Sequence, residues 1–289
     1  MTCVAASRET RLTPTSWPGR DLTQMGFTTG ISTKDVVFGG EEKLRQAIDY
    51  IVVSYAPEAV FVYSTCVTAM IGDDIDAACR QTEEAHGIPM VPVHAPGFVG
   101  SKNLGSRLAG KAVLNHLVGT MEPETITPFD INLIGEYNVT GDMWQYTPLL
   151  EELGIRVLST LSGDGRISYI RTAHRAKLNV LVCAKSLISL TRKMEQRHGM
   201  PSISVSFYGK QDTSASILAI AEALVKKNSE IRHRSFPHLQ GLKATDQLVA
   251  ALLDASGLDE PLPALFAGVN VCRAPCSTVI FPSVKRAFY

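Results

Sequence analysis

The chain has 289 residues, 45% of them hydrophobic and 19% charged, which is long enough for two ordinary domains with buried cores. Twenty-eight basic residues balance 28 acidic ones, so charge gives no reason to expect nucleic acid or an anionic membrane as a partner. There is no signal-peptide pattern, no stretch near the ~20 apolar residues of a membrane span, and too few cysteines for a disulfide-stapled domain. We therefore expect a globular, cytoplasmic protein.

The first half of the chain predicts one β-α-β unit. Between Gly39 and Tyr55 apolar residues recur at i, i+3, i+4 and i+7, as on one face of an amphipathic helix. The run AVFVY that follows is typical of a parallel strand covered on both faces by helices. The predicted elements are helix 39–55, strand 59–63, helix 71–86, strand 90–93 and, after a glycine-punctuated loop, a helix ending near Val118.

The second half repeats this alternation after a linker at 122–128. Its predicted elements are strand 131–134, helix 144–153, strands 155–160 and 178–183, helix 185–198, strand 203–207 and helix 213–226. Alternating strands and helices indicate an α/β fold with Rossmann-like, doubly wound parallel sheets. We therefore expect an N-terminal segment 1–30 that is partly irregular, α/β domains at 31–127 and 128–227, and a divergent tail 228–289.

Two cysteines lie where such sheets bind ligands, outside the carboxyl ends of strands. Cys66 follows the first predicted strand and precedes a helix, and Cys183 closes the strand that begins at Leu178. The partial positive charge of a helix N-terminus favours the thiolate, which is the form that binds iron. However, free cysteines are often simply buried and inert, and neither residue has the close Cys or His spacing of a metal site. From position alone, both interpretations stay open.

Other candidate motifs favour structural roles. Cys272 and Cys276 form a CxxxC pattern, but a proline between them argues against a shared helical face. Asp73 and Asp74 lie where acidic residues commonly compensate a helix dipole. The loop around Lys102 has neither the dinucleotide fingerprint nor the Walker A order, and no zinc-hydrolase or serine-hydrolase motif occurs. These patterns provide no catalytic residue.

Four segments resemble the α-type subunits of the nitrogenase component-1 family: AVFVYSTCVTAMIGDDID at 59–76, PGFVGSKNLG at 96–105, FDINLIGEYN at 129–138 and FYGKQDTS at 207–214. The resemblance runs in continuous order over roughly 16–226. Within the family, these segments look most like the subunits that act as a scaffold for assembly of the iron-molybdenum cofactor. The resemblance implies Rossmann-like domains, of which this sequence accounts for two of the three expected.

The resemblance also implies roles for individual residues. The residue matching Cys66 is a ligand of a [4Fe-4S] cluster shared with a β-type, NifN-like scaffold subunit, and the residue matching Cys183 anchors an iron-sulfur precursor of the cofactor. Catalytic subunits have a glutamine at the position of Lys102 and a histidine at that of Ser106. A lysine suits electrostatic contact with an anionic precursor, so we assign Lys102 to that contact. The nitrogenase iron protein is a further expected partner.

Two departures from the family keep alternatives open. The family supplies further cluster cysteines from an N-terminal segment, but 8–15 contains none, and Cys3 lacks the family's glycine-proline context. A [4Fe-4S] cluster needs four ligands, so the chain by itself supplies an incomplete set. The alternatives to a scaffold are a catalytic component-1 α-like oxidoreductase subunit and a folded remnant without clusters.

Overall fold

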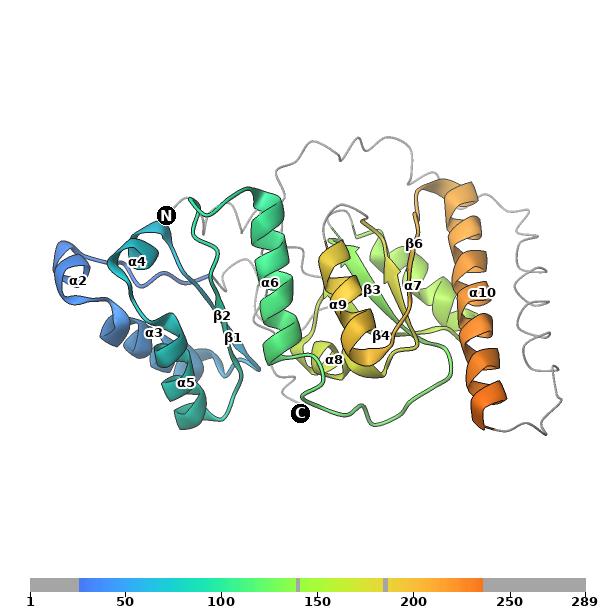
Figure 1. Ribbon diagram of the computed structural model, residues 1–289, viewed down its shortest axis with the longest axis horizontal. Coiled ribbons are helices and arrows are strands. Elements are labelled where there is room, and N and C mark those ends of the chain that lie inside the picture. The colour runs from blue at the N-terminus through green and yellow to red at the C-terminus, as the bar shows by residue number, and fades with distance from the viewer. Residues whose placement is uncertain (1–25, 139–140, 184–186, 236–289) are drawn as a thin grey trace. The chain divides into compact units, whose positions relative to one another are not determined.

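The computed structural model describes residues 26–138, 141–183 and 187–235, which divide into two compact units (Figure 1). The first contains the described residues up to Met121 together with Asp164–Arg171, and the second contains Glu122–Gly163 and those from Thr172 onward. Parallel strands connected by helices occur in both, which confirms the predicted α/β class. Within the described ranges, no helix is both long and apolar enough to cross a bilayer.

The first unit is built around a pair of parallel strands, β1 and β2, which pair Val60 with Met90 and Tyr63 with Val93. Its elements are α2 (Thr33–Phe38), α3 (Glu41–Tyr55), β1 (Val60–Tyr63), α4 (Cys66–Ile71), α5 (Ile75–His86), β2 (Met90–Val93) and α6 (Lys102–His116). The single helix expected at 71–86 is replaced by α4 and α5. Gly72 adopts a left-handed backbone with φ +79°, which ends α4 and lets a second helix begin.

The second unit contains a parallel sheet with strand order β4-β3-β5-β6. Its strands are β3 (Asp130–Glu136), β4 (Arg156–Ser162), β5 (Leu178–Leu181) and β6 (Ser202–Ser204). From β3 the chain moves to β4 at one edge, returns across β3 to β5, and then continues to β6 at the other edge. The direction of winding therefore reverses between β3 and β5. In doubly wound sheets, ligands bind at such a switch point, outside the carboxyl ends of the strands.

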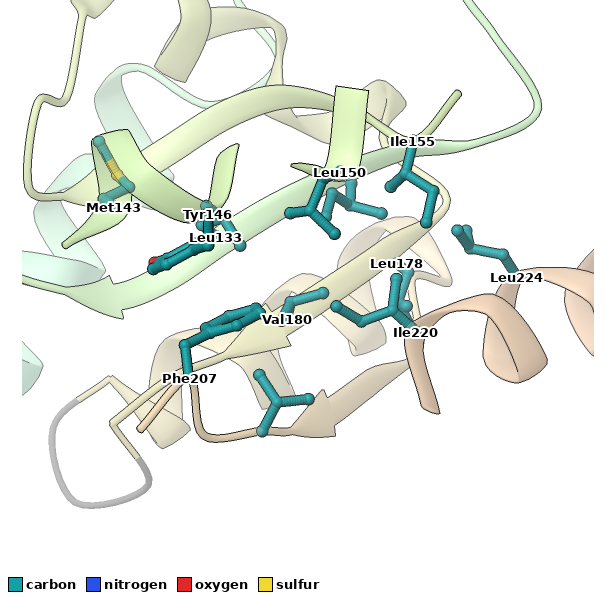
Figure 2. Close-up of a cluster of buried hydrophobic side chains, with 12 residues drawn as sticks. Leu133, Met143, Tyr146, Leu150, Ile155, Leu178, Val180, Phe207, Ile220 and Leu224 are labelled. Atoms are coloured by element: carbon teal, nitrogen blue, oxygen red, sulfur yellow. The ribbon is translucent and has the colours of Figure 1, made fainter. Parts of the chain in front are cut away.

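Helices α7 (Met143–Glu152) and α10 (Gly209–Ser235) contribute to the main core of this unit (Figure 2). Leu133 and Val180 face this core from neighbouring strands, and the rings of Tyr146 and Phe207 stack at a centroid distance of 3.9 Å. Side chains alternate along a strand, so Asn132 and Asn179 lie on the opposite face of the sheet. On that opposite face Asn132 Nδ2 donates to Ala173 O at 2.9 Å, so other chain segments cover both faces of the sheet.

Several boundaries differ from the sequence-based expectation. Strand β6 ends at Ser204 instead of Phe207, and α9 (Ile188–His198) begins three residues later than predicted. A short helix, α8 (Ile167–Thr172), and a 3-10 helix (Ala173–Arg175) were not predicted, because elements this short show no clear periodicity. Cys3, Cys272, Cys276 and the tail beyond Ser235 lie outside the described residues.

Candidate functional site

Cys66 is the first residue of α4, and only Ser64 and Thr65 separate it from β1. The backbone N–H of Thr65 donates to Thr68 Oγ1 at 2.8 Å and fixes the start of the helix. The thiol is exposed, and a Cβ added to Gly97 would lie 3.3 Å from its Sγ. The structure thus places Cys66 at the expected strand end and brings it beside the glycine-punctuated loop.

Large apolar side chains are exposed on the elements around Cys66. Helix α2 packs against α4, yet none of its residues is buried, and Phe38 is 80% exposed. On α4 itself Met70 is 78% exposed, and Phe98, next to Gly97, is 58% exposed. Isolated exposed apolar residues are ordinary, but several on adjoining elements are typical of a protein interaction surface. We call this set the apolar rim of Cys66; it comprises Val37, Phe38, Val67, Met70, Phe98 and Val99.

The acidic pair beyond Cys66 has a structural role, but neither residue lies in the first turn of a helix as the sequence predicted. Asp73 Oδ1 accepts from the backbone N–H of Gly40 at 2.9 Å and ties the start of α3 to the turn after α4. Asp74 is the N-cap of α5, with Oδ1 accepting from Ala77 N at 2.8 Å. Both carboxylates are therefore used in holding helix ends.

Lys102 is the first residue of α6, directly after the glycine-punctuated loop, and it is exposed. A cation at a helix N-terminus opposes the helix dipole, so Lys102 adds positive charge where the helix already has some. This arrangement favours an anion nearby. Ser106, one turn further along α6, is buried.

Cys183 lies just beyond β5, at the switch point between β3 and β5. Val182 N donates to Ile134 O at 2.9 Å, which keeps the two strand ends paired up to that point. The Cys183 side chain is partly exposed. We expected it to precede a helix directly, as Cys66 does, but α9 begins at Ile188 and residues 184–186 lie outside the described residues. The likeness of the two cysteines is thus limited to their strand ends.

A buried polar group at the end of β3 was missed by sequence reasoning. The Tyr146 hydroxyl donates to Glu136 Oε2 at 3.0 Å, and Asn138 N donates to Glu136 Oε1 at 2.7 Å. Burial raises the pKa of Glu136, and hydrogen bonds such as those from Asn138 N and the Tyr146 hydroxyl oppose that rise. Gly135, directly after the predicted strand 131–134, was a usable signal, because a glycine that continues a strand often marks a bulge.

The described residues around Cys66 and around Cys183 can each provide one thiolate contact to iron. They do not form a complete metal site. In the three described ranges, no group of three His, Cys, Asp or Glu side chains could hold a metal ion. Cys66 and Cys183 lie in different units and each offers one sulfur ligand. Any further ligands of a cluster at Cys66 would have to come from outside these ranges or from another chain.

Comparison with known proteins identifies the family. The family described as nitrogenase component 1 type oxidoreductase matches residues 1–235. The nitrogenase iron-molybdenum cofactor biosynthesis protein NifE of Nostoc sp. is 57% identical over 206 residues, covering 71% of this chain and 43% of that protein. NifE of Rippkaea orientalis is 58% identical over 199 residues, covering 69% and 42%.

Two further matches also cover most of this chain. NifE of Sinorhizobium fredii is 47% identical over 251 residues, covering 86% of this chain and 49% of that protein. Among solved structures, nitrogenase Cp1 at pH 6.5 has a TM-score of 0.67 and 29% identity, covering 82% of this chain and 44% of that chain. The chain thus spans somewhat less than half the length of these relatives. It belongs to the nitrogenase component-1 family and is similar to NifE.

Proposed function

We propose that this chain is a scaffold subunit for iron-molybdenum cofactor biosynthesis, which holds an iron-sulfur precursor during maturation together with a β-type, NifN-like partner. The observation that carries the proposal is the place of Cys183 at the switch point of the sheet, in a chain 57% identical over 206 residues to a NifE protein. A thiolate there can anchor an iron-sulfur precursor.

The surroundings of Cys66 support a second part of the proposal. An exposed thiol inside an apolar rim suits a [4Fe-4S] ligand that is shared across an interface, because the rim would be covered by the partner that supplies the other ligands. Such a cluster would keep Cys66 as a thiolate and hold the two chains together. The β-type partner therefore occupies the rim in this proposal.

Lys102 is proposed as an electrostatic contact for the anionic precursor. Its ammonium group and the N-terminus of α6 provide positive charge at one place. Among the described residues, Ser106 argues against the catalytic alternative. Ser106 has no imidazole to relay protons, and its side chain is buried within α6.

Anaerobic co-purification with the β-type partner tests the anchor. We expect the complex with Cys183→Ala to retain much less iron and sulfide than the wild-type complex. Cys79→Ala is the matched control, because burial raises the pKa of the Cys79 thiol to about 12 and keeps it protonated and away from iron. Equal iron in the wild-type and Cys183→Ala complexes would refute the anchor. The nitrogenase iron protein, expected as a second partner, can be added in the same assay.

A further inference from the structure

A β-bulge at the end of β3 turns Glu136 toward the main core of the second unit. The register between β3 and β4 shifts between Ile134 and Glu136, and Gly135 has φ +78°. Regular alternation would place Glu136 on the same face as Ile134, away from the core that contains Leu133 and Tyr146. The bulge reverses this, and such bulges commonly re-aim a side chain next to a functional site.

The re-aimed carboxylate organises the residues that follow it. Figure 2 shows Tyr146 stacked on Phe207. The Tyr146 hydroxyl donates a hydrogen bond to Glu136, and the backbone N–H of Asn138 donates a second one. On the outer side Gly163 lies so close that an added Cβ would be 2.7 Å from the Asn138 Cβ. Asn138 is thus fixed between the carboxylate and a neighbouring backbone.

In the side-chain amide of Asn138, Oδ1 has a hydrogen-bond partner, whereas none of the described residues accepts from Nδ2. It is 3% exposed and has a left-handed backbone with φ +50°, and its Oδ1 accepts from Met143 N at 3.1 Å. Turning the amide over would set two donors against each other, so Nδ2 cannot replace Oδ1 there. Nδ2 is buried and has no hydrogen-bond partner among the described residues. A buried donor without an acceptor destabilises the fold, and this penalty is removed when an acceptor binds.

Asn138 follows β3 and Cys183 follows β5, and these two strands lie on either side of the switch point. Ile134 pairs with Leu181 in the register of β3 and β5, so the residues just after each strand meet at one edge of the sheet. Neighbouring strands are about 4.8 Å apart. A ligand anchored at Cys183 would therefore lie at the same edge of the sheet as Asn138.

We propose that Asn138 Nδ2 donates a hydrogen bond to an anionic acceptor, such as a cluster sulfide, on the precursor held by Cys183. Glu136 and Tyr146 act as positioning residues, because they set the backbone of Asn138 and do not themselves reach the precursor. This inference rests on the proposed function and adds a second, non-thiolate contact to it. Hydrogen bonds to charged groups are the stronger kind, so this contact is expected to matter for retention.

Asn138→Asp is the sharpest test, because aspartate keeps the acceptor for Met143 N and tolerates the left-handed backbone while replacing only the orphaned donor. Asn179→Asp is the matched control. Asn179 is also fully buried, and its Oδ1 accepts from Asn132 Nδ2 at 2.9 Å. Its Nδ2 likewise has no partner within the part of the chain that the structure describes. It lies near the start of β5, away from the strand ends that carry Cys183.

The probe is iron(II) with sulfide, added anaerobically to each complex with the β-type partner, and the iron that depends on Cys183 is quantified. We expect Asn138→Asp to retain about tenfold less of this iron than Asn179→Asp. Asn138→Gly keeps the backbone and adds no charge, so it must show a loss too, including where the aspartate variant fails to fold. Equal retention by the Asn138 and Asn179 variants would overturn the inference alone, whereas undiminished iron in Cys183→Ala would overturn the anchor and the inference with it.

Discussion

The two candidate cysteines lie at the same kind of position in their sheets, yet their surroundings differ. Cys66 is exposed, next to a helix with no buried residue and within an apolar rim. Cys183 is partly covered and lies at the end of a sheet whose main core is packed from both α7 and α10. The difference fits the two separate roles proposed for these cysteines. The surface around Cys66 suits association with another protein, and the strand ends around Cys183 suit retention of a ligand.

The largest expected effect is a loss of stability in the second unit when its buried ion pair is broken. Asp130 is fully buried, and Arg156 donates to both of its carboxylate oxygens at 2.7 Å. Arg156→Met leaves that charge unpaired and should cost about 4 kcal/mol of unfolding free energy in chemical denaturation. Arg175→Met, which breaks an exposed pair with Glu122, should change stability little.

The same ion pair has a predictable pH dependence. Burial alone raises the pKa of Asp130, but hydrogen bonds from Arg156 and Thr127 outweigh it and hold the pKa below its ordinary value. A depressed acid pKa contributes stability that is complete above the unfolded value, about 3.9, and is lost as pH falls through the folded value. The unfolding free energy of the wild type should thus lose this contribution below about pH 4. A pH series in which Arg156→Met shows the same acid loss would contradict this assignment.

The second prediction compares a core residue with a rim residue directly. Leu150 is fully buried in the second unit, so Leu150→Ala should lower the unfolding free energy by about 3 kcal/mol. Phe38 lies on the rim, so Phe38→Ser should leave stability within about 0.5 kcal/mol and weaken association with the β-type partner about tenfold. Unchanged partner affinity in Phe38→Ser, measured by calorimetry, would exclude Phe38 from the interface.

Glu136 gives a smaller effect of opposite sign to that of Asp130. Because burial raises the pKa of Glu136, its protonated form favours the fold, and that stability is lost as pH rises through the folded pKa. Glu136→Gln cannot ionise. In thermal unfolding, the stability of the variant relative to the wild type should therefore rise with pH from the ordinary glutamate pKa, about 4.3, upward. A difference that stays constant with pH would show that Glu136 does not titrate in this range.

The smallest expected effect lies beside Cys66. A methyl group at Gly97 would approach the thiol to 3.3 Å, so Gly97→Ala should slow alkylation of Cys66 by a few fold. Gly105→Ala is the control, because its added Cβ would meet no described atom within 4 Å outside its own turn of α6. Equal alkylation rates in the two variants would mean that the loop at Gly97 does not shield the thiol.

Much of the fold could be read from the sequence, because buried parallel strands and amphipathic helices leave clear periodic patterns. The strand at Val60 and the helix over Glu41–Tyr55 are examples. The break at Gly72 and the short helix α8 could not be read reliably, since one glycine conformation or six residues carry little pattern.

The candidate site was predictable in part. The places of Cys66 and Cys183 followed from the rule on strand ends, but their assigned roles came from the family resemblance and stay proposals. The Glu136 and Asn138 group was missed because it depends on a bulge and on contacts from Tyr146 and Gly163. Such contacts join residues far apart in the sequence, and no local pattern indicates them.

The most direct test of the scaffold proposal is iron and sulfide quantification with EPR on the anaerobically co-purified complex. The account predicts a partnered, iron-bearing chain whose cluster signal falls in Cys66→Ala and whose precursor iron falls separately in Cys183→Ala. A chain that purifies alone and without iron after reconstitution would contradict it, and would identify the protein as a folded remnant of its family.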